Sequence, residues 1–266
     1  MWPLPRDRAS LLSLLPEEER LVADTANADS PRDAQIHANA LYRLGEIRFR
    51  LREMQKAEQI FDESATVFLA LEHEPSKQSN RDWAAQSRVR QANAAATEGR
   101  YDDALKAIER MIEESDGFPD FAMSPEMQAL ALWLWLISLQ EAEQFERLYE
   151  AAGTAMALVN PGATERERLI YVRATEKRAR AAQALGHSDE AVAMYKRAIA
   201  GFKLQEDPRF RGRELVGAMG RLGELLIELG RTKEAASTIA HALVPLMKLE
   251  LNAALRRVGL KRRAPH

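Results

Sequence analysis

Apolar and polar positions along the chain follow a helical rather than a strand pattern. Long windows combine Ala and Leu with Glu, Arg and Gln, all of which favour helices. Runs of alternating Val, Ile, Thr and Tyr between Asn-Gly or Asp-Gly turns are nearly absent. The pattern therefore predicts an all-α protein.

The clearest local pattern lies in residues 223–242, GELLIELGRTKEAASTIAHA. Small residues at Gly223 and Ala235 allow two antiparallel helices to approach closely, and Gly230 suits the turn between them. Ile239 and Ala242 fall on the inner face of the second helix. The stretch predicts a helical hairpin.

The same arrangement recurs along the chain. Residues equivalent to Ala235 are separated by 47, 44, 43 and 44 positions and are, in order, Ala57, Ala104, Leu148, Ala191 and Ala235 itself. A period in this range is typical of a stack of helix pairs. Ser-Pro pairs at residues 30–31 and 124–125 suit helix starts, because serine caps the first turn and proline fits its first position.

These offsets resemble the tetratricopeptide repeat (TPR), and GRYDDA at residues 99–104 is the best local match to its turn. The resemblance implies a right-handed α-α superhelix, a TPR-like solenoid of about five helical hairpins with terminal capping helices. The usual repeat has about 34 residues, so these units are about ten residues longer. Similar long repeats occur in kinesin light chains and in some bacterial regulators and peptide sensors.

The register predicts three parts of the chain. Residues 1–30 are expected to form N-terminal capping helices, because a solenoid must cover the apolar face of its end repeat. Five hairpins are expected within 31–248, at about 31–72, 80–115, 124–159, 163–205 and 208–247. Residues 249–266 are expected to form a C-terminal cap and a basic tail.

The third hairpin departs from the others. Leu136 and Leu148 stand where other hairpins have small residues, and its first helix, around Trp133, is apolar nearly all round. Such a helix is either buried on several sides or leaves an apolar patch exposed. An exposed patch could be covered in a homodimer, so self-association stays open.

Composition narrows the classes of partner. The 38 basic and 40 acidic residues nearly cancel, so no nucleic-acid binding through a general positive field is expected. The basic cluster at residues 256–263 could contact an anionic partner, but a solubilising tail is the better interpretation. The N-terminus has no signal-peptide pattern, and the most apolar window, residues 129–139, is too short to cross a bilayer. We expect a cytoplasmic protein without membrane insertion.

No catalytic or cofactor motif is recognisable. The chain has no cysteine, which excludes disulfides, thiolate metal sites and cysteine nucleophiles, and none of its five histidines lies in a metal-binding pattern. Gly217, Gly220 and Gly223 form GxxGxxG within a helical pattern, which indicates close helix contact rather than a nucleotide-binding loop. We therefore expect no enzyme activity, no metal and no cofactor.

The resemblance also implies a concave groove lined by the first helix of each hairpin. The residues expected to face a partner there are Tyr42, Glu46, Gln86, Asn93, Trp133, Arg173, Glu176, Arg180 and Gln183. Tyr42 and Trp133 would act as anchors, and Arg173 and Arg180 would pair with carboxylates. Asn93 stands where many peptide-binding TPRs carry an asparagine that bonds the ligand backbone. The alternatives are a buried core position for Trp133 and a solvated, acid-paired helix face for the two arginines.

The sequence thus predicts a non-catalytic scaffold or adaptor that binds a peptide or a partner helix in this groove. The lysines of a chaperone-tail carboxylate clamp have no clear counterpart. A regulatory sensor that holds a signal peptide or small ligand in the groove is the alternative function, and a self-associating structural protein is a third. The identity of the partner does not follow from the sequence.

Overall fold

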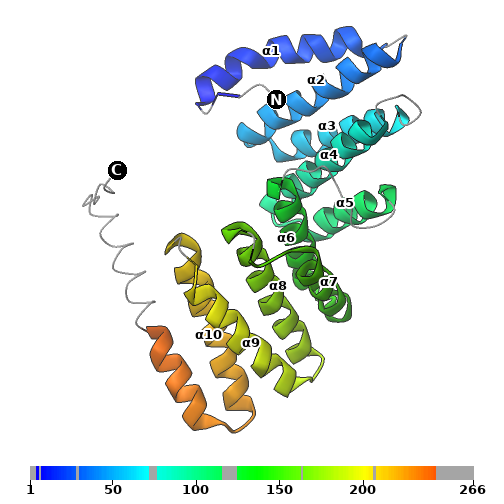
Figure 1. The fold of residues 1–266 in the computed structure, drawn as a ribbon. Helices are drawn as coiled ribbons and strands as arrows, with labels where there is room; N and C mark the ends of the chain where they lie inside the picture. The colour runs from blue at the N-terminus through cyan, green and yellow to red at the C-terminus, as the bar shows by residue number, and fades with distance from the viewer. Residues whose placement is uncertain are drawn as a thin grey trace. The chain divides into compact units, whose positions relative to one another are not determined.

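A computed structural model describes residues 4–5, 7–27, 30–71, 77–115, 125–162, 164–205 and 208–243 of the chain. Within these ranges the secondary structure is helical and contains no strand. The helices are α1 (Arg8–Thr25), α2 (Pro31–Arg50), α3 (Met54–Ala70), α4 (Lys77–Thr97), α5 (Tyr101–Glu114), α6 (Pro125–Glu141), α7 (Phe145–Leu158), α8 (Glu165–Ala184), α9 (Ser188–Lys203) and α10 (Pro208–Glu228) (Figure 1). Residues 232–243 are also helical. The cap and tail expected at 249–266 lie outside the described residues.

The chain divides into two compact units, Met1–Ala142 and Glu143–His266. In the first unit, α2 packs on α3, α3 on α4, α4 on α5, and α5 on α6, so each helix contacts the next along the chain. In the second unit, α7 packs on α8, α8 on α9, and α9 on α10. The boundary falls between α6 and α7, inside the third hairpin expected from the sequence.

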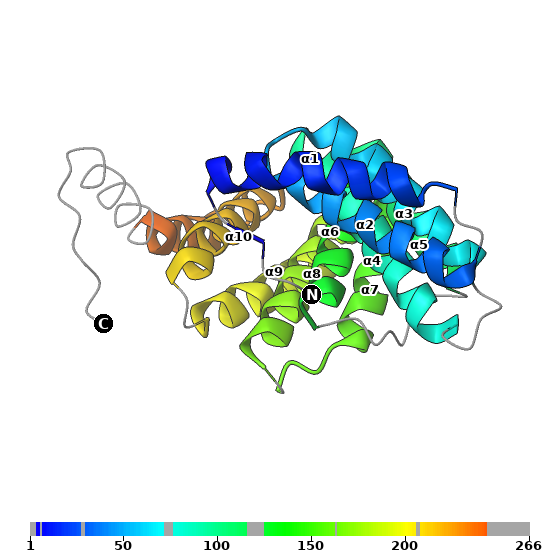
Figure 2. The same cartoon turned by 90° about the horizontal axis from the view of Figure 1, so that it is seen from above.

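Helix α1 covers one end of the first unit. It packs along α2, and the two helices lie side by side in both views (Figure 2). Pro16 lies inside this helix. Glu18 of α1 is buried and forms an ion pair with Arg43 of α2. The ion pair joins α1 to α2.

The turns within the hairpins share one backbone conformation. Gly99, Gly186 and Gly230 have φ of 76°, 80° and 70°, as expected for the glycine that ends a helix. Arg52 and Glu143 have φ of 69° and 54° at the equivalent positions of the first and third hairpins. A backbone N–H bonds to the carbonyl five residues earlier in four of these turns: Glu53 to Arg48, Arg100 to Ala95, His187 to Ala182 and Arg231 to Leu226. The hairpins therefore share the turn even where glycine is missing.

Small residues bring the paired helices into contact, as the spacing predicts. A Cβ atom added to Gly45 would lie 2.7 Å from Cε1 of Phe61, whose ring is fully buried. A Cβ atom on Gly223 would lie 2.8 Å from Cγ1 of Ile239. Both pairs are sixteen residues apart, so the same small-to-large contact holds the first and the fifth hairpins together.

The prediction for the GxxGxxG stretch of α10 holds at one glycine. Gly223 lies in close contact with Ile239, but no described atom lies within 4 Å of a Cβ added to Gly220. At Gly217 the nearest such atom is the flexible guanidinium end of Arg221, at 3.6 Å. Gly217 and Gly220 thus lie outside the close helix contact.

The apolar helix of the third hairpin is α6. Its described large apolar residues include Leu132, Leu134, Leu136 and Leu139, which are buried, and Leu148 of α7 is buried as well. None of the exposed large apolar side chains identified in the described residues lies on α6. Burial, rather than an exposed patch, therefore accounts for the composition of this helix.

Candidate partner-binding groove

Tyr42 lies in the core of the first unit. Its side chain is 3% exposed, and its ring contacts Phe61 and Trp83 edge-on, with centroids 5.6 Å and 5.3 Å away. Burial raises the pKa of its hydroxyl above the ordinary value. Because the ring packs between helices α2, α3 and α4, Tyr42 supports the unit from inside and presents no surface anchor.

Glu46 is also engaged within the first unit. It is buried on α2, and its Oε1 lies 2.6 Å from Nε of Arg90 on α4. Arg50 lies farther away, with Nε 4.0 Å from Oε2 of Glu46. The carboxylate thus ties the first helices of two successive hairpins together, and a partner would have to compete with Arg90 for it.

Gln86 and Asn93 differ from these two residues. Both are half-buried on α4, and their seven-residue spacing places them on one face of the helix. The backbone carbonyl of Asn93 accepts a hydrogen bond from Oγ1 of Thr97, at 2.7 Å. Neither side-chain amide forms a hydrogen bond with another described residue, so both are available to bond a ligand backbone.

Trp133 is half-buried on α6, which places it between the two alternatives set by the sequence. Its neighbours Ala131 and Leu134 are buried in the apolar cluster that α4, α5 and α6 share. Part of the indole is therefore exposed on the first unit.

In the second unit, Arg173 is held by a carboxylate. Its Nε lies 2.9 Å from Oε1 of Glu214 on α10, and Nη2 bonds to the same oxygen. Arg173 is thus paired with an acid, as in the alternative considered for it, and the acid comes from the next hairpin. Arg173 thereby links α8 to α10.

Glu176 is buried on α8 and neutralised by two cations. Its Oε1 accepts a hydrogen bond from Nη1 of Arg221 at 2.7 Å, and its Oε2 lies 3.1 Å from Nζ of Lys177. Burial lowers the pKa of Lys177, and the positive charges of Arg221 and Arg180 add to the effect. The carboxylate of Glu176 therefore faces a region of positive charge.

Arg180 and Gln183 line a pocket next to this pair. The pocket has a volume of about 470 Å³ and is lined by Phe145, Arg180, Gln183, Ala184, Tyr195, Arg221 and Glu224. Gln183 is fixed because its Oε1 accepts a hydrogen bond from the hydroxyl of Tyr195 at 3.1 Å. Burial raises the pKa of Tyr195, so this hydroxyl keeps its proton at neutral pH.

Arg180 is less exposed than Glu224, the other charged residue of the pocket for which the described residues supply no ion pair. It is half-buried, and no described carboxylate forms an ion pair with it. Arg221, by contrast, is held by Glu176. A guanidinium that lines a pocket without an internal ion pair favours binding of a ligand carboxylate.

The structure adds residues that the sequence register did not select. Arg221 and Tyr195 line the pocket, and Glu214 accepts a hydrogen bond from Arg173. Arg221 lies on α10, outside the residues that the register selects, and its long side chain reaches Glu176 of α8. The repeat register selects backbone positions, so it misses side chains that reach the site from the flank.

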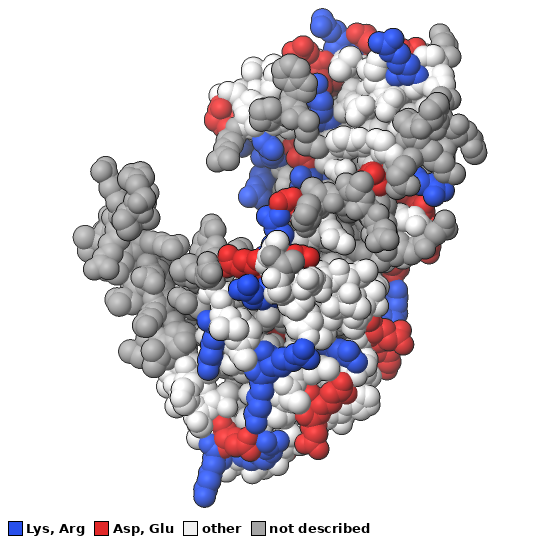
Figure 3. Space-filling model, viewed as in Figure 1, with Lys and Arg blue, Asp and Glu red and all other residues white. Residues whose placement is uncertain are grey.

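Charges of both signs are mixed over the described surface of each unit in the view of Figure 3, in keeping with a net charge of −2. In the described residues, no three His, Asp or Glu side chains come together as a potential metal site. None of the helices described is both long and apolar enough to span a membrane.

Comparisons with known proteins point to one fold. Residues 176–246, which include the pocket residues of α9 and α10, match the family model described as tetratricopeptide repeat. BtubC (BKLC) from P. vanneervenii has a similar structure, with a TM-score of 0.62 at 18% identity, over 100% of this chain and 95% of that one. A search of curated proteins found no match.

Two structures of a putative kinesin light chain with nearly identical TPR-like repeats, from Podosopora anserina, are also similar. One has a TM-score of 0.54 at 14% identity, over 83% of this chain and 98% of that one. The other, of a variant with one substitution, has a TM-score of 0.54 at 13% identity, over 80% and 95%. At these identities the likeness establishes the fold, an all-α superhelix of repeated helix pairs. Residues 176–246 thus match tetratricopeptide repeats, and the chain as a whole shares the all-α superhelical fold of these TPR-like proteins.

Proposed function

We propose that this protein is a non-catalytic scaffold whose second unit binds an acidic segment of a partner protein in the pocket around Arg180. TPR-like repeats commonly serve as protein-interaction scaffolds. The observation that carries the proposal is the state of Arg180, a half-buried guanidinium in a pocket with no described ion-pair partner. A partner carboxylate would supply the missing counter-charge.

The surroundings of Arg180 suit a peptide rather than an isolated anion. The amide of Gln183 is held by Tyr195 through its oxygen, which leaves its NH₂ group free to donate to a ligand carbonyl. Phe145 adds an apolar wall to the same pocket. A segment that offers a carboxylate, a main-chain carbonyl and a small apolar contact would therefore fit these groups.

The first unit can contribute polar contacts of its own. Gln86 and Asn93 present unpaired side-chain amides on one face of α4. Side-chain amides can donate hydrogen bonds to an extended main chain and accept hydrogen bonds from it, and these bonds do not require a charged ligand. These amides would give a partner a second place to bind, on the first unit.

Binding partners captured from native cells would test the proposal. The bait would be the full chain, compared with Arg180→Glu and with Lys233→Glu as a control. Lys233 is exposed in the segment 232–243 and does not line the pocket. We expect at least one protein to be retained by the wild type and the control but reduced about tenfold with Arg180→Glu. Identical partner profiles for all three proteins would refute the proposal.

A further inference from the structure

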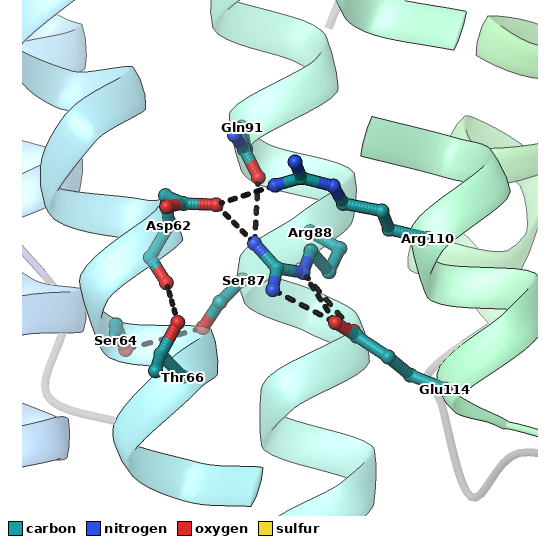
Figure 4. Close-up of polar contacts among 8 residues, drawn as sticks. All are labelled: Asp62, Ser64, Thr66, Ser87, Arg88, Gln91, Arg110 and Glu114. Atoms are coloured by element: carbon teal, nitrogen blue, oxygen red, sulfur yellow. Dashed lines mark hydrogen bonds and ion pairs between the residues drawn. The ribbon is translucent and has the colours of Figure 1, made fainter. Parts of the chain in front are cut away.

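The opposite face of α4 carries a polar network that the proposed groove does not use. Arg88 and Gln91 lie about half a helical turn away from Gln86 and Asn93. Arg88 is 4% exposed, and its Nε and Nη2 bind the carboxylate of Glu114 on α5 at 3.0 Å and 2.8 Å (Figure 4). Its Nη1 bonds to Asp62 of α3 and to Oε1 of Gln91. One buried guanidinium thus joins three helices.

This network borders a pocket between α3, α4 and α5. The pocket has a volume of about 340 Å³ and is lined by Gln55, Glu58, Gln59, Asp62, Gln91, Arg100 and Arg110. Three of these residues are glutamines. Because Oε1 of Gln91 accepts from Arg88, its NH₂ group is left to donate to a ligand, whereas the exposed amides of Gln55 and Gln59 can both donate and accept.

The charged groups of the pocket favour an anion over a cation. Arg110 is 59% exposed, and its Nη1 lies 3.5 Å from Oδ1 of Asp62, an oxygen that already accepts from Arg88. Arg110 can therefore turn to a ligand carboxylate while Arg88 continues to neutralise Asp62. A cationic ligand would instead have to displace Arg88 from Asp62 or Arg100 from Glu58. Both of these pairs are better buried than the one with Arg110.

We propose that this pocket is a further protein-binding site, which takes an extended peptide segment through its main chain and one Asp or Glu side chain. The glutamines bond the main chain, and Arg110 pairs with the carboxylate. The lining has as many carboxylates as guanidiniums and no aromatic side chain, which disfavours nucleic acid. The site lies on α3, α4 and α5 of the first unit, so it is separate from the Arg180 pocket of the second unit and does not depend on it.

A phage-displayed library of short random peptides, panned on the full chain, would test this site. Selected peptides would be measured by fluorescence anisotropy against the wild type, Arg110→Ala, Gln59→Ala, Lys106→Ala and Arg180→Glu. Arg110 and Gln59 are exposed, so their replacement leaves the core intact. Lys106, one turn before Arg110 on α5 and 71% exposed, is the matched control because it does not line the pocket.

We expect a group of selected peptides that share an Asp or Glu. Their Kd should rise about tenfold with Arg110→Ala and rise also with Gln59→Ala, but stay unchanged with Lys106→Ala and Arg180→Glu. Changing the peptide's acid to its amide should weaken binding to the wild type and have little effect with Arg110→Ala. The proposal is overturned if no peptide is selected, or if no selected peptide responds to Arg110→Ala. Peptides that respond only to Arg180→Glu would overturn this site while supporting the pocket of the second unit.

Discussion

Arg52 and Gly230 adopt the same left-handed backbone conformation, with φ of 69° and 70°, at equivalent turns of the first and fifth hairpins. Glycine tolerates this conformation, whereas a side chain with a Cβ atom is strained in it by about 1–2 kcal/mol. The hydrogen bond that closes the turn is nevertheless present after Arg52, from the N–H of Glu53 to the carbonyl of Arg48 at 3.0 Å. Packing of the hairpin thus imposes the turn on a residue that does not favour it.

Replacing Arg52 with glycine should therefore stabilise the protein. Relief of the backbone strain exceeds the entropy that glycine adds to the unfolded chain, so we expect the free energy of unfolding to rise by about 0.5–1 kcal/mol. Gly230→Ala, the reverse change at the equivalent turn, should lower it by about 1 kcal/mol. Urea denaturation followed by circular dichroism measures both. A loss of stability with Arg52→Gly would contradict this prediction, because it would show that the contacts of the Arg52 side chain outweigh the backbone strain.

Gly45 and Gly220 should respond in opposite directions to substitution by alanine. A methyl group on Gly45 meets the buried ring of Phe61 at 2.7 Å, which should cost about 1–3 kcal/mol. At Gly220 no described atom lies within 4 Å of the new methyl group, so the helix propensity of alanine should add up to about 1 kcal/mol. Thermal denaturation of the two variants distinguishes them. Equal effects would contradict the assigned helix contact.

These glycines show why the fold could be predicted from the sequence. Gly45 and Gly223 each lie sixteen residues before a large apolar residue, and turn glycines such as Gly99 and Gly230 lie seven residues after a small one. Close packing allows few residue types at such positions, so the pattern can be recognised in a single sequence. The pattern could not reveal that Arg52 and Glu143 keep the glycine conformation, because tertiary packing overrides their own preference.

Loss of Arg88 should destabilise the first unit. Its side chain is buried between the carboxylates of Asp62 and Glu114, and Arg88→Ala would leave both without their shared partner. Since these carboxylates are partly exposed and can be rehydrated, we expect a loss of about 2 kcal/mol, below the about 3–5 kcal/mol of a fully buried pair. Lys106→Ala on the exposed side of α5 should change the free energy of unfolding by less than about 0.5 kcal/mol. Chemical denaturation of the full chain measures both, and similar losses would contradict the structural role of Arg88.

Glu18 should make the stability depend on pH. Burial raises its pKa above the ordinary value of 4.5, against the opposing charge of Arg43. Between pH 4.5 and this higher pKa, the folded state binds more protons than the unfolded state, so the contribution of Glu18 to stability falls as the pH rises through that window.

The variant Glu18→Gln has no charge to bury, so its stability should lack the pH-dependent contribution of Glu18. Its free energy of unfolding, measured relative to the wild type from pH 4.5 upward, should increase and then level off above the raised pKa. Glu19→Gln provides the control, because Glu19 is 46% exposed on the same helix. A difference between Glu18→Gln and the wild type that does not vary with pH would contradict the assignment.

The site was less predictable than the fold. Arg180 and Gln183, which the register places on one helix face three residues apart, line one pocket. The register did not show that Glu46 and Glu176 are occupied by Arg90 and Arg221, since those partners come from the neighbouring hairpin. Nor could it show the burial of Tyr42, which depends on rings from two other helices. Helix period fixes the face of a residue, but long-range packing decides whether its side chain is free.

A charge exchange at Arg180 tests the central claim most directly. Once a partner has been captured, isothermal titration would give the Kd of its binding segment for the wild type and for Arg180→Glu, with the segment's acidic residue either intact or changed to arginine. We expect each single change to weaken binding by about tenfold or more, and the two together to restore much of the affinity. Equal affinity of the intact segment for both proteins, or no recovery when both charges are exchanged, would contradict the claim that Arg180 holds a partner carboxylate.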